Sequence, residues 1–198
     1  TVLVLDSPGG LVSGGLEVAQ IAHDRGMSTD IPPNGRCYSS CSFIFLAGKQ
    51  RSAQGEFGVH QLEGDGETSL ADVQTTMSDV LETLLEFGTP TDVMTRMLRT
   101  SNSDVYVYQP EEMKRLGLVT SEMALAPTIK SEIAAGEKPS PSVVNQGAPA
   151  RTTLGAFAVV DGVDDSVYLN GAIDQNSVAD LRRALGVRPA AKTIVLLS

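Results

Sequence analysis

Hydroxyl and thiol side chains cluster just before an apolar run in the stretch GRCYSSCSFIFLAG, residues 35–48. The cluster consists of Cys37, Ser39, Ser40, Cys41 and Ser42. A serine where a helix begins lies beside unpaired backbone N–H groups and the positive end of the helix dipole, which favours a nucleophile. Ser39 is therefore the candidate nucleophile, and the N–H of Ser40 is a candidate donor to an oxyanion. The alternative is that these serines only cap a helix.

A hydroxyl nucleophile needs a base within hydrogen-bond reach, and the sequence contains only two histidines, His23 and His60. His23 lies among polar residues of a predicted helix, which is typical of a solvated side chain. His60 ends an apolar stretch and precedes a glycine-rich acidic turn. Strand ends that open into loops often carry catalytic side chains, so His60 is the candidate general base. A histidine buried in the core is the alternative.

A Ser-Pro-Gly-Gly segment, residues 7–10, follows the apolar run TVLVLD at the start of the chain. This pattern predicts a buried strand that ends in a tight turn before a helix. A pair of glycines lets the backbone approach a ligand closely. The N–H of Gly10 is therefore a second candidate donor to an oxyanion, with an ordinary turn as the alternative.

Short apolar, β-branched runs alternate with segments of helical periodicity along the chain. This alternation predicts an α/β fold with a mostly parallel sheet. The longest predicted helix is amphipathic and covers residues 69–87. Residues 127–154 are rich in Pro, Ser and Ala, which predicts a linker. The pattern predicts a strand, a helix and a strand in residues 155–198.

The composition limits the functions that the chain can have. A formal charge of −9 and the absence of a basic stripe argue against a nucleic-acid partner and against a polybasic membrane surface. The sequence contains no glycine-rich phosphate-binding loop, so no nucleotide site is expected. No other organic cofactor is implied either. The spacing of Cys37 and Cys41 fits a local disulfide, two buried thiols or half of a metal site. No second cysteine pair exists, so no metal is expected.

The order of these motifs resembles one family. A strand, the segment Ser-Pro-Gly-Gly and a helix come first. A Gly-x-x-x-Ser motif follows, with an apolar run that ends in Ala-Gly. Next come an arginine and a strand that ends in His-Gln. An aspartate follows six residues before the segment PEEMKRLGLV, residues 110–119. In this order the motifs resemble the proteolytic subunit of the Clp protease, ClpP, within the ClpP/crotonase superfamily. The resemblance covers Thr1 to about Glu122.

The resemblance implies a role for five residues of this sequence. Ser39 would be the nucleophile, His60 the general base and Asp104 the residue that orients the base. The N–H groups of Gly10 and Ser40 would form the oxyanion hole. Without the resemblance, Asp104 is an ordinary turn residue before a strand. The final Asp of the family's Gly-Leu-Val-Asp pattern is replaced by threonine here, which leaves the three catalytic positions unaffected.

The resemblance also implies a fold and an activity. The fold would be built of stacked βαβ units, and the chain would be a serine endopeptidase that hydrolyses peptides or unfolded proteins through an acyl-enzyme. It would form a homo-oligomer, with residues 69–87 in the place of the helix that stacks rings of subunits. A separate unfoldase or an envelope protein would be its partner. The alternatives are an acyl-CoA hydratase or thioesterase of the crotonase type, and a non-catalytic binding or assembly module.

Two departures from the family pattern carry further expectations. Cys37 and Cys41 flank Ser39 where the cytosolic family has small residues, and this resembles predicted periplasmic ClpP-like proteins of bacteria. A periplasmic or envelope location would permit a disulfide. Residues 1–126 would be a catalytic region that lacks the usual first strand and helix. Residues 155–198 resemble that missing unit, either as the start of a tandem repeat or as a permuted completion of the same sheet.

Overall fold

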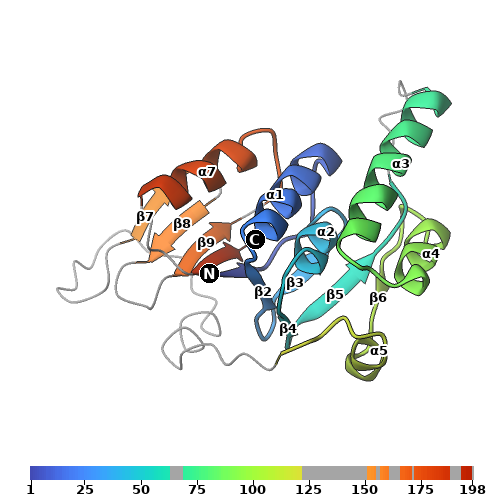
Figure 1. The fold of residues 1–198 in the computed structure, drawn as a ribbon, viewed down its shortest axis with the longest axis horizontal. Helices are drawn as coiled ribbons and strands as arrows, with labels where there is room; N and C mark the ends of the chain where they lie inside the picture. Colours follow the sequence, from blue (N-terminus) through green and yellow to red (C-terminus); the bar gives the residue numbers. More distant parts are fainter. Residues whose placement is uncertain are drawn as a thin grey trace.

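The computed structural model describes residues 1–62, 69–121, 151–154, 157–160, 166–170, 172–187 and 193–197 (Figure 1). Over these residues the chain forms a mixed α/β fold, which confirms the predicted class. The helices are α1 Val12–Asp24, α2 Cys41–Leu46, α3 Leu70–Glu86, α4 Thr91–Arg99, α5 Pro110–Arg115 and α7 Ser177–Val187.

Two sheets carry the described strands. The large sheet has the order β4-β2-β1-β10-β9-β8-β7, and its pairs from β4 to β9 are all parallel. Its strands are β1 Val2–Leu5, β2 Ser28–Ile31, β4 Arg51–Ala53, β7 Arg151–Leu154, β8 Phe157–Val160, β9 Ser166–Asn170 and β10 Thr193–Leu197. The small sheet has the order β3-β5-β6 and consists of β3 Arg36–Tyr38, β5 Glu56–Val59 and β6 Tyr106–Val107.

The C-terminal strands belong to the same sheet as the first strand. β10 lies between β1 and β9 and pairs with both in parallel, with Leu3 opposite Ile194. The segment thus extends the sheet, and β10 occupies a position of its own beside β1. Residues 127–150 of the predicted linker lie outside the described residues. The end of that predicted linker, Arg151–Leu154, is strand β7. The division of the chain into a catalytic region, a linker and a further unit stays a prediction.

The core lies around β1 and the helices that cover it. Leu3, Val4 and Leu5 are all fully buried, which is typical of a central strand covered on both faces. The helices α7, α1 and α2 lie side by side (Figure 1). The cluster of buried apolar side chains continues from α1 into α7 through Ile173 and Leu181. The C-terminal helix therefore shares the core of the N-terminal strands.

Arg51 joins the large sheet to the segment around α5. Its guanidinium donates hydrogen bonds to the carbonyls of Leu118 at 2.8 Å, Gly117 at 3.0 Å and Gly48 at 3.0 Å. These carbonyls follow the ends of α5 and α2, where the helix dipole favours a cation. Burial lowers the pKa of Arg51 from its ordinary value. The side chain therefore ties β4 to the segments that follow α2 and α5.

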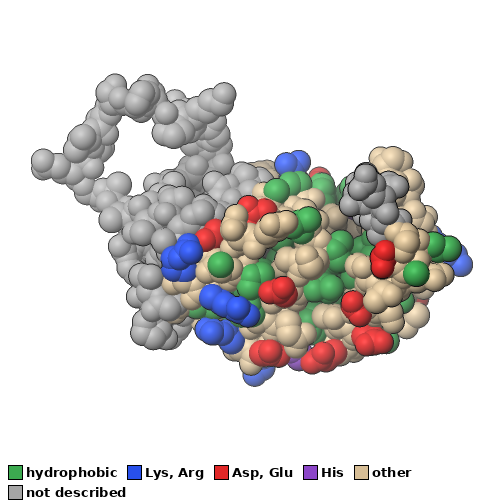
Figure 2. Space-filling model, turned by 90° about the horizontal axis from the view of Figure 1, so that it is seen from above, with side chains coloured by type: hydrophobic (Ala, Val, Ile, Leu, Met, Phe, Trp, Pro, Cys, Tyr) green, Lys and Arg blue, Asp and Glu red, His purple; other side chains and the backbone are tan. Residues whose placement is uncertain are grey.

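The surface is dominated by acidic and neutral groups. Figure 2 shows carboxylates spread over the face seen from above, with hydrophobic side chains between them, several basic groups near one end and others at the rim. This face carries no continuous basic stripe, as the formal charge of −9 leads one to expect. In the described part of the chain, no helix combines the length and the apolar character that a membrane span requires.

Leu181→Ala tests whether α7 packs on the common core. Leu181 is fully buried, so we expect this substitution to lower the free energy of unfolding by about 2–5 kcal/mol. Leu85→Ala on α3 is the matched control, because Leu85 is 59% exposed and its loss should change stability by less than about 0.5 kcal/mol. Urea denaturation measures both. An equal, small effect at the two positions would show that α7 does not pack on this core.

Candidate functional site

Ser39 lies at a sharp turn between β3 and α2. β3 ends at Tyr38, α2 begins at Cys41, and Ser39 has a φ of +55°. For a residue with a Cβ atom, this left-handed conformation costs roughly 1–2 kcal/mol. Such strain persists only where the surroundings impose it, and it concentrates at functional sites. Ser39 is half-buried, and its backbone is therefore held in a conformation that an isolated turn would not favour.

The Ser-Pro-Gly-Gly turn packs directly on Ser39. Gly9 has a φ of +98°, and a Cβ atom at this position would lie 2.6 Å from Ser39 Cβ and 3.2 Å from Ser39 Oγ. Only glycine fits here, because a methyl group would collide with the serine. The approach is fixed by backbone hydrogen bonds, from Ser7 N–H to Arg36 O at 2.6 Å and from Tyr38 N–H to Ser7 O at 3.1 Å. The end of β1 is thus tied to β3.

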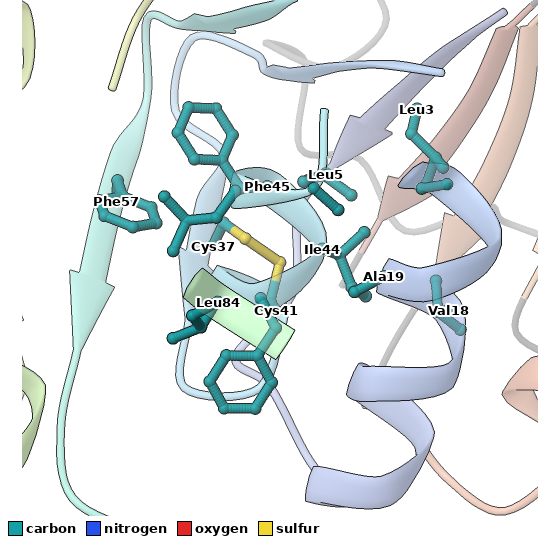
Figure 3. Packing of buried hydrophobic residues seen from close by; sticks show 14 of the residues in the cluster. Leu3, Leu5, Val18, Ala19, Cys37, Cys41, Ile44, Phe45, Phe57 and Leu84 are labelled. Carbon is teal, nitrogen blue, oxygen red and sulfur yellow. A yellow bond between two sulfur atoms is a disulfide. The ribbon is translucent and has the colours of Figure 1, made fainter. Parts of the chain in front are cut away.

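A disulfide between Cys37 and Cys41 closes the Ser39 turn. The two Sγ atoms are 2.05 Å apart and the Cα atoms 5.2 Å apart. Both cysteines are fully buried, and Figure 3 shows the bond surrounded by apolar side chains that include Phe45, Phe57 and Leu84. Of the alternatives that the sequence left open for these cysteines, the structure has the local disulfide. It holds the residues before and after Ser39 together covalently.

Two backbone N–H groups beside Ser39 are unpaired. Within the described residues, neither Gly10 N–H nor Ser40 N–H donates to a protein acceptor. The groups around Gly10 are paired, since Leu11 N–H donates to Ile173 O at 2.8 Å and Ile173 N–H donates to Gly9 O at 3.0 Å. Ser40 is buried, where most backbone donors are paired, whereas Gly10 is exposed to solvent. Both N–H groups are available to donate to a ligand oxygen beside the strained serine.

The small sheet brings His60 and Asp104 to the same end as Ser39. β3 is parallel to β5, with Tyr38 opposite Gly58, so Ser39 and His60 both follow the carboxyl ends of neighbouring strands. β6 is antiparallel to β5, so the residues that precede Tyr106, Asp104 among them, reach this end too. The topology therefore places the three residues that the resemblance singled out at the same end of the small sheet.

The three side chains are not hydrogen-bonded to one another. His60 Nδ1 lies 2.7 Å from the backbone oxygen of Gln61. Asp104 is exposed, and its Oδ1 accepts the N–H of Val105 at 2.8 Å. In the part of the chain that the structure describes, no hydrogen bond joins Ser39 Oγ to His60, or His60 to Asp104. The roles of Ser39, His60 and Asp104 therefore stay predictions.

His23, the other histidine, lies far from this site, on α1. Its ring packs on Phe87 with the centroids 4.7 Å apart, and Nδ1 lies 3.9 Å from Glu86 Oε1 at the end of α3. His23 therefore links α1 to the end of α3. Its side chain is more enclosed than the solvated side chain that the sequence predicted.

Tyr38 stiffens the strand that leads into Ser39. Its ring packs against Gly58, where a Cβ atom would lie 2.8 Å from Tyr38 Cδ1. Its hydroxyl donates a hydrogen bond to Glu56. Burial, followed by the interaction with Glu56, raises the pKa of Tyr38 to about 12. The phenol therefore stays neutral and anchors β3 to β5.

Two residues of the site, Gly9 and Ile173, were not assigned to it by sequence reasoning. Gly9 belongs to a glycine pair of which the sequence singled out Gly10, and the pair itself was the signal for both. Ile173 could not be found, because it comes from a distant part of the chain and contributes only its backbone. Among the described residues, no group of three or more His, Cys, Asp or Glu side chains is arranged to hold a metal ion.

Comparison with known proteins gives little beyond this geometry. No family model matches the sequence, and no curated protein matches it. Among solved structures, the fold is similar to that of a ClpP1 mutant from Listeria monocytogenes, with 18% identity and a TM-score of 0.47. The match covers 60% of this chain and 70% of the other chain. A likeness of this size does not assign a family.

Gly9→Ala tests the contact between the glycine turn and Ser39. Gly88→Ala is the matched control, since Gly88 also has a positive φ, of +70°, but a Cβ atom there would meet nothing within 4 Å. We expect Gly88→Ala to cost roughly 1–2 kcal/mol of unfolding free energy from backbone strain alone. Gly9→Ala should cost clearly more, because the collision with Ser39 adds to the strain. Equal losses in urea denaturation would show that Gly9 and Ser39 do not touch.

Proposed function

We propose that this chain is a serine peptidase with the ClpP/crotonase arrangement of stacked βαβ units. Ser39 is the nucleophile, His60 is the general base, and Asp104 is the acidic residue of this Ser-His-Asp triad. Gly10 and Ser40 supply backbone N–H groups to the oxyanion. The observation that carries the proposal is the strained Ser39 turn, packed on Gly9 and flanked by two unpaired N–H groups.

The proposed reaction follows from these positions. Ser39 Oγ attacks a peptide carbonyl carbon while its proton passes to His60 Nε2. The negative charge that develops on the carbonyl oxygen is stabilised by the N–H groups of Gly10 and Ser40. The proton then passes from His60 to the leaving amine, and an acyl-enzyme remains on Ser39. Water, deprotonated by His60, then attacks the ester. The second product leaves with its new carboxyl group, and the proton returns from His60 to Ser39 Oγ.

Further parts of the proposal concern the setting of the enzyme. Substrates are peptides or unfolded proteins, and the chain acts as a homo-oligomer. The Cys37–Cys41 disulfide supports an oxidising compartment such as the periplasm or the cell envelope. A separate unfoldase or an envelope protein is the proposed partner.

A crotonase-type hydratase or thioesterase is the second candidate function. The pair of unpaired N–H groups favours it equally, because such enzymes use backbone donors on a thioester oxygen. It does not require the Ser39 hydroxyl, however, whereas the strained turn presents that hydroxyl directly beside the glycine turn. Chemistry at Ser39 therefore separates the two functions.

Labelling with a fluorophosphonate probe tests the nucleophile. We expect the wild-type protein to be labelled and Ser39→Ala to lose labelling completely, because the probe forms a covalent bond only with an activated serine oxygen. Ser42→Ala removes a neighbouring hydroxyl and should keep the label. Mass spectrometry of the labelled peptide identifies the modified residue. A folded wild-type protein that takes up no label would contradict the peptidase.

His60→Ala tests the base, and the second histidine offers a matched control. Loss of a general base lowers rates by about 10²- to 10⁴-fold, and we expect a decrease of this size in the labelling rate of Ser39. His23→Ala should react like the wild type, since His23 lies on α1 against Phe87. Time courses of probe labelling measure the three rates. The role of His60 as base would be wrong if both alanine variants reacted at the wild-type rate.

A further inference from the structure

His60 is held by a backbone carbonyl. His60 Nδ1 lies 2.7 Å from the oxygen of Gln61. A carbonyl oxygen can only accept a hydrogen bond, so the hydrogen must reside on Nδ1. The neutral imidazole then carries its free lone pair on Nε2. A base needs this tautomer in order to take a proton from a serine. The hydrogen-bond partner of one ring nitrogen determines whether the other nitrogen carries a hydrogen.

The carbonyl that does this is itself anchored to the end of α4. Gln61 N–H donates to Thr100 O at 2.9 Å, and Gln61 Nε2 donates to Leu98 O at 2.7 Å. The last carbonyls of a helix have no partner within the helix, so they are free to accept such bonds. Gln61 is thereby attached through its backbone and its side chain. The C-terminal end of α4 determines where the Gln61 carbonyl lies.

Asp104 is engaged in its own turn. Its N–H donates to Ser101 O at 3.0 Å, and its Oδ1 accepts the N–H of Val105 at 2.8 Å. The side chain is exposed, so water competes for its remaining lone pairs. Neither carboxylate oxygen is bonded to His60 among the described residues. Among the described residues, the hydrogen-bond partner of the imidazole is the Gln61 carbonyl.

We infer that Gln61 is the positioning residue of the general base: its backbone carbonyl fixes the Nδ1–H tautomer of His60, and its side-chain amide holds that carbonyl on the end of α4. This inference rests on the proposed function for its catalytic meaning, but the tautomer itself can be measured without any activity. During the reaction, the Nδ1–H keeps its bond to the carbonyl while Nε2 takes the proton of Ser39 Oγ. The carbonyl dipole then faces the imidazolium.

The tautomer is accessible to nitrogen NMR, because the chain contains only two histidines. Protein labelled with ¹⁵N-histidine is studied at about pH 8, above the ordinary histidine pKa of ~6.5. The signals of His60 are assigned by comparison with His23→Gln. We expect His60 to show a protonated Nδ1 and an unprotonated Nε2. The opposite pattern, a protonated Nε2 in the wild-type protein, would overturn the inference directly.

Two variants separate Gln61 from Asp104. Gln61→Met keeps the length of the side chain but removes the amide that binds Leu98 O, and we expect a mixture of the two His60 tautomers. Asp104→Asn should leave the Nδ1–H tautomer as in the wild type. A matched control, Gln20→Met, removes another exposed glutamine amide, which donates to Asp24 at 3.0 Å on α1, and should leave the His60 signals unchanged. Loss of the tautomer in Asp104→Asn but not in Gln61→Met would overturn the inference.

The labelling rate links the tautomer to the reaction. Loss of one hydrogen bond that orients the base predicts a decrease of about two- to ten-fold in the rate for Gln61→Met. Near-ultraviolet circular dichroism confirms that the variant is folded. If Ser39 is never labelled while the Nδ1–H tautomer is observed, the proposed function fails and the assignment of the tautomer stands. If labelling occurs and Gln61→Met changes neither the tautomer nor the rate, the inference fails alone.

Discussion

The left-handed backbone of Ser39 is the constraint on which the rest of the site depends. A φ of +55° is unfavourable for serine, so the surrounding structure must supply the energy that keeps it there. Two features impose it. The buried disulfide joins Cys37 and Cys41 across the turn, and Gly9 lies so close that no larger residue fits. The disulfide links the two ends of the turn covalently, and the glycine turn packs against Ser39 itself.

The site is also where the two sheets meet. The large sheet supplies the glycine turn after β1, and the small sheet supplies Ser39 after β3 and His60 after β5. A bridge between Ser7 and Cys37 aligns them. The C-terminal part of the chain takes part as well, because Ile173 pairs with the backbone on both sides of Gly10. This pairing uses Gly9 O and Leu11 N–H, and it leaves the N–H of Gly10 without an acceptor among the described residues.

Sequence patterns predicted the parts of this fold that have strong local signals. The amphipathic periodicity predicted a helix over 69–87, and the structure has α3 at Leu70–Glu86. The glycine pair and the serine before an apolar run marked the two turns of the candidate site. The pairing of β3, β5 and β6 could not be predicted, because these strands have only two to four residues and their register is set by tertiary contacts. Gln61 follows His60 directly in the chain, but the hydrogen bond between its carbonyl and the His60 ring depends on the local backbone conformation, which no sequence pattern predicted.

The two halves of the candidate site are held by different forces. Ser39 is fixed by a covalent bond and by the core around Phe45 and Phe57, which together resist displacement. His60 is half-buried, and it is held through hydrogen bonds to a partly exposed strand end and to the end of a short helix. Local opening costs least where few apolar contacts are broken. The nucleophile is therefore the rigid partner of this pair and the base the movable one, so the geometry of proton transfer depends on how firmly α4 holds the end of β5.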